Sequence, residues 1–142
     1  MRQYKSRFLL SLMAVTILLV GCLPIIKSAK DYEEIPPMLY ILTNKAQLAI
    51  EEGYYDKGEQ AVLDYVGKKN PDVLEWFEGR NYELRVGAIA DYAVVLVCDE
   101  GRPVFEDTYC NPGFPDKDHR SNNNLKSCEI TMTIEEVKKF CQ

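Results

Sequence analysis

The sequence predicts an α+β fold, in which N-terminal helices pack on a small antiparallel β-meander that a C-terminal helix completes. Apolar residues recur at helical spacing as far as Gly79, and directly after it they alternate with polar residues, as in a half-buried strand. Near the end of the chain, Thr133 and Glu136 have the spacing of a capping box, which predicts a final helix. We therefore expect one α+β domain over residues 37–142, with two disulfides.

The first 21 residues have the features of an export signal. Arg2, Lys5 and Arg7 precede an apolar run at 8–20, which has the length of a signal-peptide core and is too short to span a bilayer. The sequence Leu-Val-Gly-Cys at 19–22 then resembles the lipobox of bacterial lipoprotein precursors. This resemblance implies cleavage before Cys22 and attachment of lipid to its sulfur.

An uncleaved membrane anchor over 8–26 is the alternative to a lipobox. Gly21 and Pro24 would lie inside its helix, where proline is unfavourable. In known lipoproteins an aspartate after the lipidated cysteine favours the inner membrane, and this chain has Leu23 there. The resemblance therefore implies a lipid-anchored, periplasm-facing protein of the cell envelope, at the outer membrane if the host has one.

We expect a tether and three helices to follow the leader. Residues 22–36 are mainly polar and end at two prolines, which is typical of a stiffened link. Apolar spacing predicts helices at 37–52 and 57–68, and Asn70-Pro71 starts a third one that ends at Gly79. Trp76 in that helix is expected to be a core anchor.

The second half of the domain is predicted to be mostly strands. Alternation at 82–86 indicates a half-buried strand, and the continuous apolar run at 92–98 a central one. A hairpin turn at 99–102 leads to a third strand at 104–109. After a 17-residue loop at 111–127, residues 128–132 are a candidate fourth strand. The last helix should then turn four residues inward: Ile134, Val137, Phe140 and Cys141.

The cysteine count favours two disulfides. With Cys22 assigned to lipid, Cys98, Cys110, Cys128 and Cys141 remain, an even number in an exported chain. The hairpin places Cys98 opposite Pro103 and Cys110 much further along the sheet, which disfavours a Cys98–Cys110 bond. We favour Cys110–Cys128 with Cys98–Cys141, and Cys110–Cys141 with Cys98–Cys128 remains the alternative.

The net charge of the chain indicates which kinds of molecule it can bind. The chain has 17 basic and 22 acidic residues, and removal of the leader leaves 14 basic residues and a net charge of −8. Such a surface repels nucleic acid and attracts a basic protein. No nucleophile motif, close cysteine pair or EF-hand loop is present, so we expect no enzyme, no metal site and no cofactor.

The loop at 111–127 is the candidate partner-binding segment. Its ends lie at cysteines, which lowers the entropy lost when the loop is ordered by a partner. Phe114, His119 and Arg120 are suitable anchors, since aromatic and arginine side chains often carry interface energy. Asp116 and Asp118, with Glu106 and Asp107 of the preceding strand, would form a negative rim.

In overall format the chain resembles the lipoprotein immunity proteins that neutralise secreted toxins, and also membrane-bound lysozyme inhibitors. Residues Cys98-Asp99-Glu100-Gly101 are similar to a cysteine-containing turn of the latter. The resemblance implies a protein-binding or inhibitory module that blocks a basic toxin or hydrolase. The alternative function is a structural accessory lipoprotein of an envelope or secretion assembly.

Overall fold

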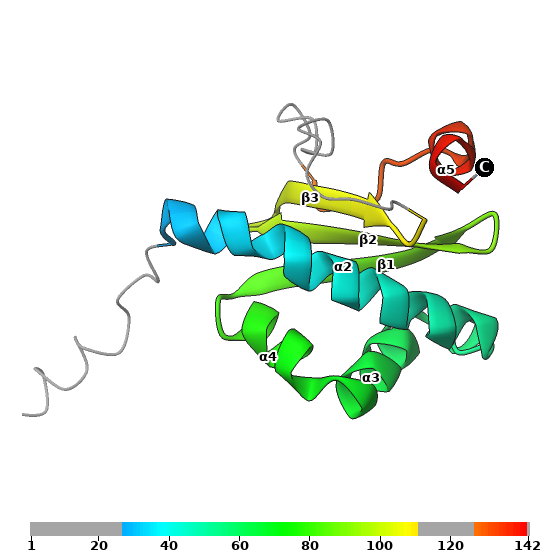
Figure 1. Cartoon of the computed structure of the whole chain (residues 1–142), viewed down its shortest axis with the longest axis horizontal. Helices are drawn as coiled ribbons and strands as arrows, with labels where there is room; N and C mark the ends of the chain where they lie inside the picture. Colours follow the sequence, from blue (N-terminus) through cyan, green and yellow to red (C-terminus); the bar gives the residue numbers. More distant parts are fainter. Residues whose placement is uncertain (1–26, 111–126, 142) are drawn as a thin grey trace, which may run out of the picture.

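The computed structural model describes residues 27–110 and 127–141, and it confirms the α+β class. Helices and a three-stranded antiparallel sheet follow one another along the chain (Figure 1). The elements are α2 (Ala29–Glu51), the short 3₁₀ helix η1 (Tyr55–Lys57), α3 (Glu59–Lys69), α4 (Pro71–Glu78), β1 (Tyr82–Ile89), β2 (Tyr92–Asp99), β3 (Arg102–Thr108) and α5 (Ile134–Cys141).

Helix α2 begins at Ala29, eight residues before the expected start and inside the segment that was predicted to be a tether. A capping box explains this start. The Asp31 backbone N–H donates to Ser28 Oγ, and the Ser28 backbone N–H donates to the Asp31 carboxylate at 2.6 Å. Pro36 and Pro37 lie inside the helix, which nevertheless buries Ile35 completely. The packed domain therefore includes residues on both sides of the two prolines.

The predicted meander is confirmed, with strand order β1-β2-β3. The turn between β2 and β3 consists of Glu100 and Gly101, both at positive φ (50° and 73°), as two-residue hairpin turns require. Cys98 pairs with Pro103 as expected, and an irregularity between Val97 and Cys98 shifts the register beyond it.

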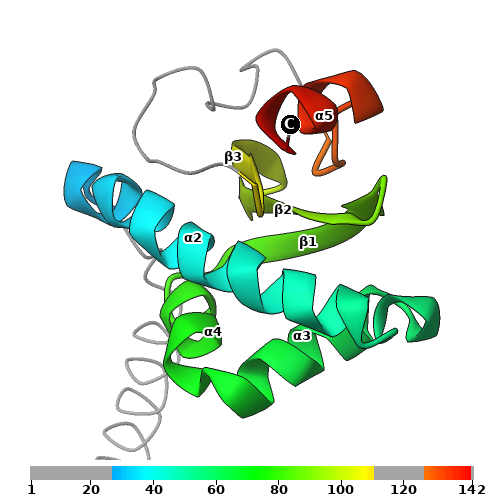
Figure 2. The ribbon, with the colours of Figure 1, turned by 45° about the vertical axis from the view of Figure 1, so that its right-hand side comes forward.

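The sheet separates two layers (Figure 2). On one face, alternate residues of β2 pack with α2, α3 and α4 in a single core cluster: Ala93, Val95 and Val97 against Leu39, Leu42, Ala46, Val62, Val66 and Phe77. The intervening residues Val94, Leu96 and Cys98 are also fully buried, on the opposite face. Strand β2 is therefore covered from both sides.

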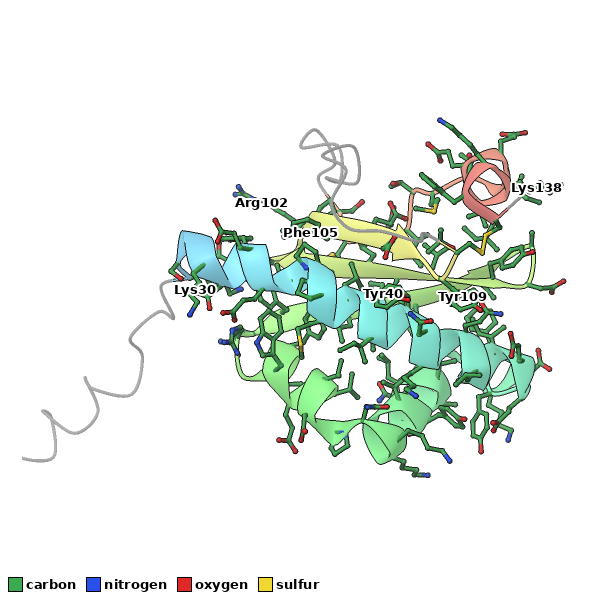
Figure 3. All side chains as sticks on the ribbon, in the orientation of Figure 1. Lys30, Tyr40, Arg102, Phe105, Tyr109 and Lys138 are labelled. Atoms are coloured by element: carbon green, nitrogen blue, oxygen red, sulfur yellow. A yellow bond between two sulfur atoms is a disulfide. The ribbon has the colours of Figure 1, made fainter. Side chains whose placement is uncertain are left out.

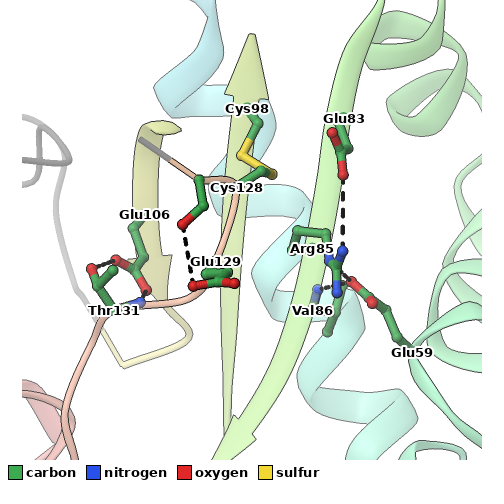
Figure 4. The surroundings of a disulfide bond; sticks show 10 residues. Glu59, Glu83, Arg85, Val86, Cys98, Glu106, Cys128, Glu129 and Thr131 are labelled. Atoms are coloured by element: carbon green, nitrogen blue, oxygen red, sulfur yellow. Dashed lines mark hydrogen bonds and ion pairs between the residues drawn. A yellow bond between two sulfur atoms is a disulfide. The ribbon is translucent and has the colours of Figure 1, made fainter. Parts of the chain in front are cut away.

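The predicted fourth strand at 128–132 is wrong, because these residues join no ladder. Instead of pairing as a strand, this segment donates hydrogen bonds to one side chain of the sheet. The carboxylate of Glu106 on β3 accepts hydrogen bonds from the Thr131 N–H (2.7 Å), the Thr131 hydroxyl (2.6 Å) and the Met132 N–H (2.9 Å) (Figure 4). Glu106 therefore holds the returning chain against the sheet.

The C-terminal helix starts with the predicted capping box. The Glu136 N–H donates to Thr133 Oγ1, and the Thr133 N–H donates to the Glu136 carboxylate at 2.7 Å. The Thr133 hydroxyl also donates to this carboxylate, and the two bonds from the Thr133 N–H and hydroxyl lower the pKa of the Glu136 carboxyl below its usual value. Val137 is fully buried, whereas Ile134, which was expected to face inward, is exposed. None of the helices in the described part of the chain is long and apolar enough to cross a bilayer.

Candidate protein-binding site

The residues chosen from the sequence as partner contacts are Phe114, Asp116, Asp118, His119 and Arg120, and they lie outside the described residues, as does Cys22. The flanks of their segment are described. Cys110 follows the end of β3, and Cys128 begins the returning chain. Both flanking cysteines are bonded to other parts of the domain.

The favoured disulfide pairing is wrong, and the alternative pairing is present. Cys98 bonds to Cys128 (Figure 4) and Cys110 to Cys141, with Cα–Cα distances of 5.9 and 4.9 Å. The reason is that Cys98 and α5 lie at opposite ends of the sheet. Cys98 is beside the β2–β3 turn, whereas Cys110 is at the far end, where the Tyr109 N–H donates to the Ala93 carbonyl. Helix α5 reaches only the far end.

Two members of the expected negative rim are not on the surface. Glu106 is 6% exposed and Asp107 is 1% exposed, so neither carboxylate can belong to a surface rim. Glu106 is occupied by the three donors from Thr131 and Met132. Its role is therefore structural.

The described residues do form a groove, between α3, α4 and β1. Its volume is about 450 Å³, and four of its lining side chains supply apolar surface: Leu63, Leu74, Tyr82 and Leu84. Gly67 lets the two helices approach closely, because a Cβ there would lie 3.1 Å from Leu74 Cδ1. A groove of this size with an apolar floor can take a side chain of a partner protein.

The rim of the groove is polar and carries more negative than positive charge. Asp64 and Glu78 contribute carboxylates, Lys68 an ammonium group and Gln60 an amide. The Gln60 amide donates to Asp64 Oδ1 at 2.9 Å, which fixes that carboxylate on the rim. Both Asp64 and Glu78 are exposed. An apolar side chain that carries a positive group at its end is complementary to this arrangement.

A second polar cluster joins the start of the described chain to the β2–β3 turn. The Asp99 carboxylate forms an ion pair with Lys27 and accepts a hydrogen bond from the Tyr32 hydroxyl at 2.5 Å. The Lys27 ammonium also lies 4.0 Å from the ring centroid of Tyr82. The bond to Asp99, together with burial, raises the pKa of Tyr32 to about 12. Burial raises the pKa of Tyr82 to about 12.

Both features were missed by sequence reasoning, for different reasons. The groove residues Leu63, Leu74 and Leu84 have the spacing of core positions, and spacing does not reveal which core positions stay partly open. The signal for the Asp99 cluster was present, because Ser28 and Asp31 have capping-box spacing and would have placed Lys27 next to the domain. Trp76 does pack against the core, and it also lies 4.2 Å under the Arg80 guanidinium.

The chain is similar in sequence to part of the trigger factors. It is 28% identical to "Trigger factor" of Pelotomaculum thermopropionicum over 112 residues, which cover 75% of this chain and 25% of that protein. It is 31% identical to "Trigger factor" of Clostridium botulinum over 94 residues, or 62% of this chain and 20% of that protein. No family model and no solved structure matches the chain. The chain thus spans about a quarter or less of the length of the curated relatives that it matches.

Proposed function

We propose that this protein is a membrane-tethered lipoprotein of the cell envelope that binds, and thereby inhibits, a basic partner protein such as a toxin or hydrolase. Lipid on Cys22 holds the domain at the membrane, facing the periplasm. The domain itself blocks its partner sterically, and its negative charge speeds their association.

The observation that carries the proposal is the pairing of the cysteines. The chain has five, and four of them form the two disulfides of the folded domain. The fifth is Cys22, which is the residue that the lipobox assigns to lipid. Structural disulfides are typical of oxidising compartments outside the cytosol, so the pairing supports export independently of the leader.

The groove between α3, α4 and β1 supports binding to a basic protein. Its floor is apolar and its rim presents Asp64 and Glu78, which suits an extended lysine or arginine side chain. The rest of the surface is also acidic overall, because the chain without its leader has a net charge of −8. Long-range attraction of this kind is screened by salt, so association should slow as ionic strength rises.

Mass spectrometry of the mature protein tests the anchor. We expect the mass of residues 22–142, increased by the acyl groups and reduced by the four hydrogens that two disulfides remove. The Cys22→Ser variant should keep its leader and gain no lipid. An unprocessed wild-type chain with reduced thiols would contradict the proposal.

Capture from envelope extracts tests the binding function. A soluble exported enzyme retained by the domain supports the inhibitor, whereas components of envelope machinery support the accessory role. Asp64→Lys should reduce capture, and Asp56→Lys, which makes the same charge change on the exposed η1, should not. Equal capture by the two variants would show that the groove is not the binding site.

A further inference from the structure

Helix α2 has large apolar residues on two sides. Its buried side packs on the sheet, and its outer side carries three of the large apolar residues that are exposed in the described part of the chain. These are Tyr40 (labelled in Figure 3), Ile41 and Leu48, which are 44%, 37% and 42% exposed. With Pro37, which is also exposed, they lie at i, i+3, i+4 and i+11, so they share one face of the helix. None of these four side chains belongs to the hydrophobic core cluster.

The chain between the lipid site and α2 is short. The described structure starts at Lys27, which is held by Asp99, and α2 follows directly at Ala29. Only five peptide steps separate Cys22 from Lys27, and an extended chain covers at most about 3.6 Å per residue. A lipid on Cys22 therefore keeps Lys27 within about 18 Å of the bilayer surface.

We propose that the outer face of α2, formed by Pro37, Tyr40, Ile41 and Leu48, lies on the lipid surface to which Cys22 is anchored. This inference rests on the proposed lipidation. At 1.5 Å per residue, the 23 residues of α2 measure about 35 Å, so a helix that starts beside the anchor can lie along the membrane. It is not apolar enough to cross a bilayer, and it lies in the interface like other amphipathic helices.

The composition of the face fits this position. Tyrosine is favoured at membrane interfaces, because its ring is apolar and its hydroxyl remains hydrated. Asn44 lies between Ile41 and Leu48 on the same face, and its amide donates to the Tyr40 carbonyl at 2.7 Å. The exposed residues Lys30, Glu33 and Glu51 carry both signs of charge at the ends of α2, so attraction to anionic lipid contributes little. The anchor supplies a high effective concentration, and a small apolar face is then sufficient.

A second copy of the chain fits the face less well. A stable dimer buries roughly 800 Å² on each partner, and side chains that are each about two-fifths exposed offer far less. The sheet face opposite α2 carries the Cys98–Cys128 bond and contacts Ile130, so it points away from the bilayer.

Tryptophan quenching by brominated lipids tests the proposal. The lipidated protein is placed in vesicles of phosphatidylethanolamine and phosphatidylglycerol, with or without bromine on the acyl chains. Ile41→Trp is compared with Ile134→Trp, which changes the same residue type at a similarly exposed site on α5. Both variants keep Trp76 as a common background. Neither alters a buried side chain, so both should fold.

We expect the fluorescence added by Ile41→Trp to fall about twofold in brominated vesicles, as for a side chain at the headgroup–acyl boundary. The fluorescence added by Ile134→Trp should not change. If both respond equally while the mass confirms the lipid, the proposed face is wrong and the anchor stands. If the mass shows no lipid, the proposed function itself fails. Protection of the Ile41→Trp tryptophan from acrylamide without bromine quenching would indicate a protein on this face and overturn the proposal.

Discussion

The Tyr32 hydroxyl donates a hydrogen bond to Asp99 Oδ2 at 2.5 Å, and so links the first turn of α2 to the end of β2, 67 residues later. The same carboxylate is paired with Lys27. This contact closes the domain at the end from which the chain leaves towards Cys22. Three kinds of interaction stabilise this end of the domain: the charge-assisted hydrogen bond from Tyr32, the ion pair of Asp99 with Lys27, and the cation–π contact of Lys27 with Tyr82.

Tyr32→Phe should destabilise the domain, because it removes the hydrogen bond to a partly buried carboxylate. Bonds of this kind contribute about 1.5–3 kcal/mol. Urea unfolding followed by circular dichroism measures the change. Tyr40→Phe on the same helix is the control, since Tyr40 is exposed. An equal effect of the two variants would mean that the bond to Asp99 contributes nothing.

Alkaline pH should destabilise the protein between about pH 10 and 12. The folded-state pKa of Tyr32 and of Tyr82 is raised from 10 to about 12, so each contributes stability that is complete below pH 10 and is lost as pH rises through 12. The unfolding free energy, measured from pH 8 to 11.5, should decrease over this window. The decrease should be smaller in Tyr32→Phe, and an identical pH profile would contradict the assignment.

The two disulfides should be reduced in a fixed order. In the Cys98–Cys128 bond one cysteine is fully buried and the other partly exposed, whereas Cys110 and Cys141 are both partly exposed. A limiting amount of reductant should therefore open Cys110–Cys141 first, and rapid alkylation with peptide mapping would locate the free thiols. Removal of either bond by serine substitution should cost about 3–4 kcal/mol, because the two close loops of nearly equal length. Preferential labelling of Cys98 would contradict the predicted order.

Glu106→Ala should destabilise the returning chain at 131–132. It removes the acceptor of two part-buried backbone N–H groups, which should cost about 1–3 kcal/mol in total, because both groups can partly regain bonds to water. Glu106→Gln keeps one acceptor oxygen and should cost much less. Hydrogen exchange of the Thr131 and Met132 amides measures the local effect. Glu83→Ala, at an exposed site on β1, should leave their exchange unchanged.

Gly87→Ala should also loosen the second layer. A Cβ on Gly87 would lie 2.7 Å from Ile130 Cδ1, so the isoleucine has to move. Overpacking of this kind costs about 1–3 kcal/mol. Ile130→Val in the same chain removes the clashing methyl group and should restore part of the loss. Unfolding of the single and double variants measures this coupling, and strictly additive effects would rule out the contact.

Local signals in the sequence were sufficient for most of the elements. The alternation at 82–86 predicts the first strand, and Glu100-Gly101 predicts the turn between β2 and β3. Both signals are local, because the side-chain period of a strand and the left-handed residues of a turn depend on only a few neighbouring positions. The Thr133–Glu136 capping box is similarly local. The start of α2 was placed too late because Pro36 and Pro37 resemble the end of a tether. Burial of Ile35, which depends on the rest of the fold, overrides this local preference.

Contacts between residues far apart in the sequence could not be predicted from such local signals. The choice between the two disulfide schemes depends on the end of the sheet at which α5 lies, and no residue near Cys128 or Cys141 encodes that position. The use of Glu106 as an acceptor for Thr131 and Met132 is equally non-local, since 25 residues separate Glu106 from Thr131. The alternation pattern of a strand does not distinguish an exposed acidic residue from a buried one.

Each disulfide joins a cysteine that precedes residues 111–127 to one that follows them: Cys98 to Cys128 and Cys110 to Cys141. A single proteolytic cut within this stretch therefore releases no fragment. The two pieces remain fastened twice and migrate together on a gel until a reductant is added. The protein can thus be nicked at the segment suggested for partner contact without losing either half of its fold.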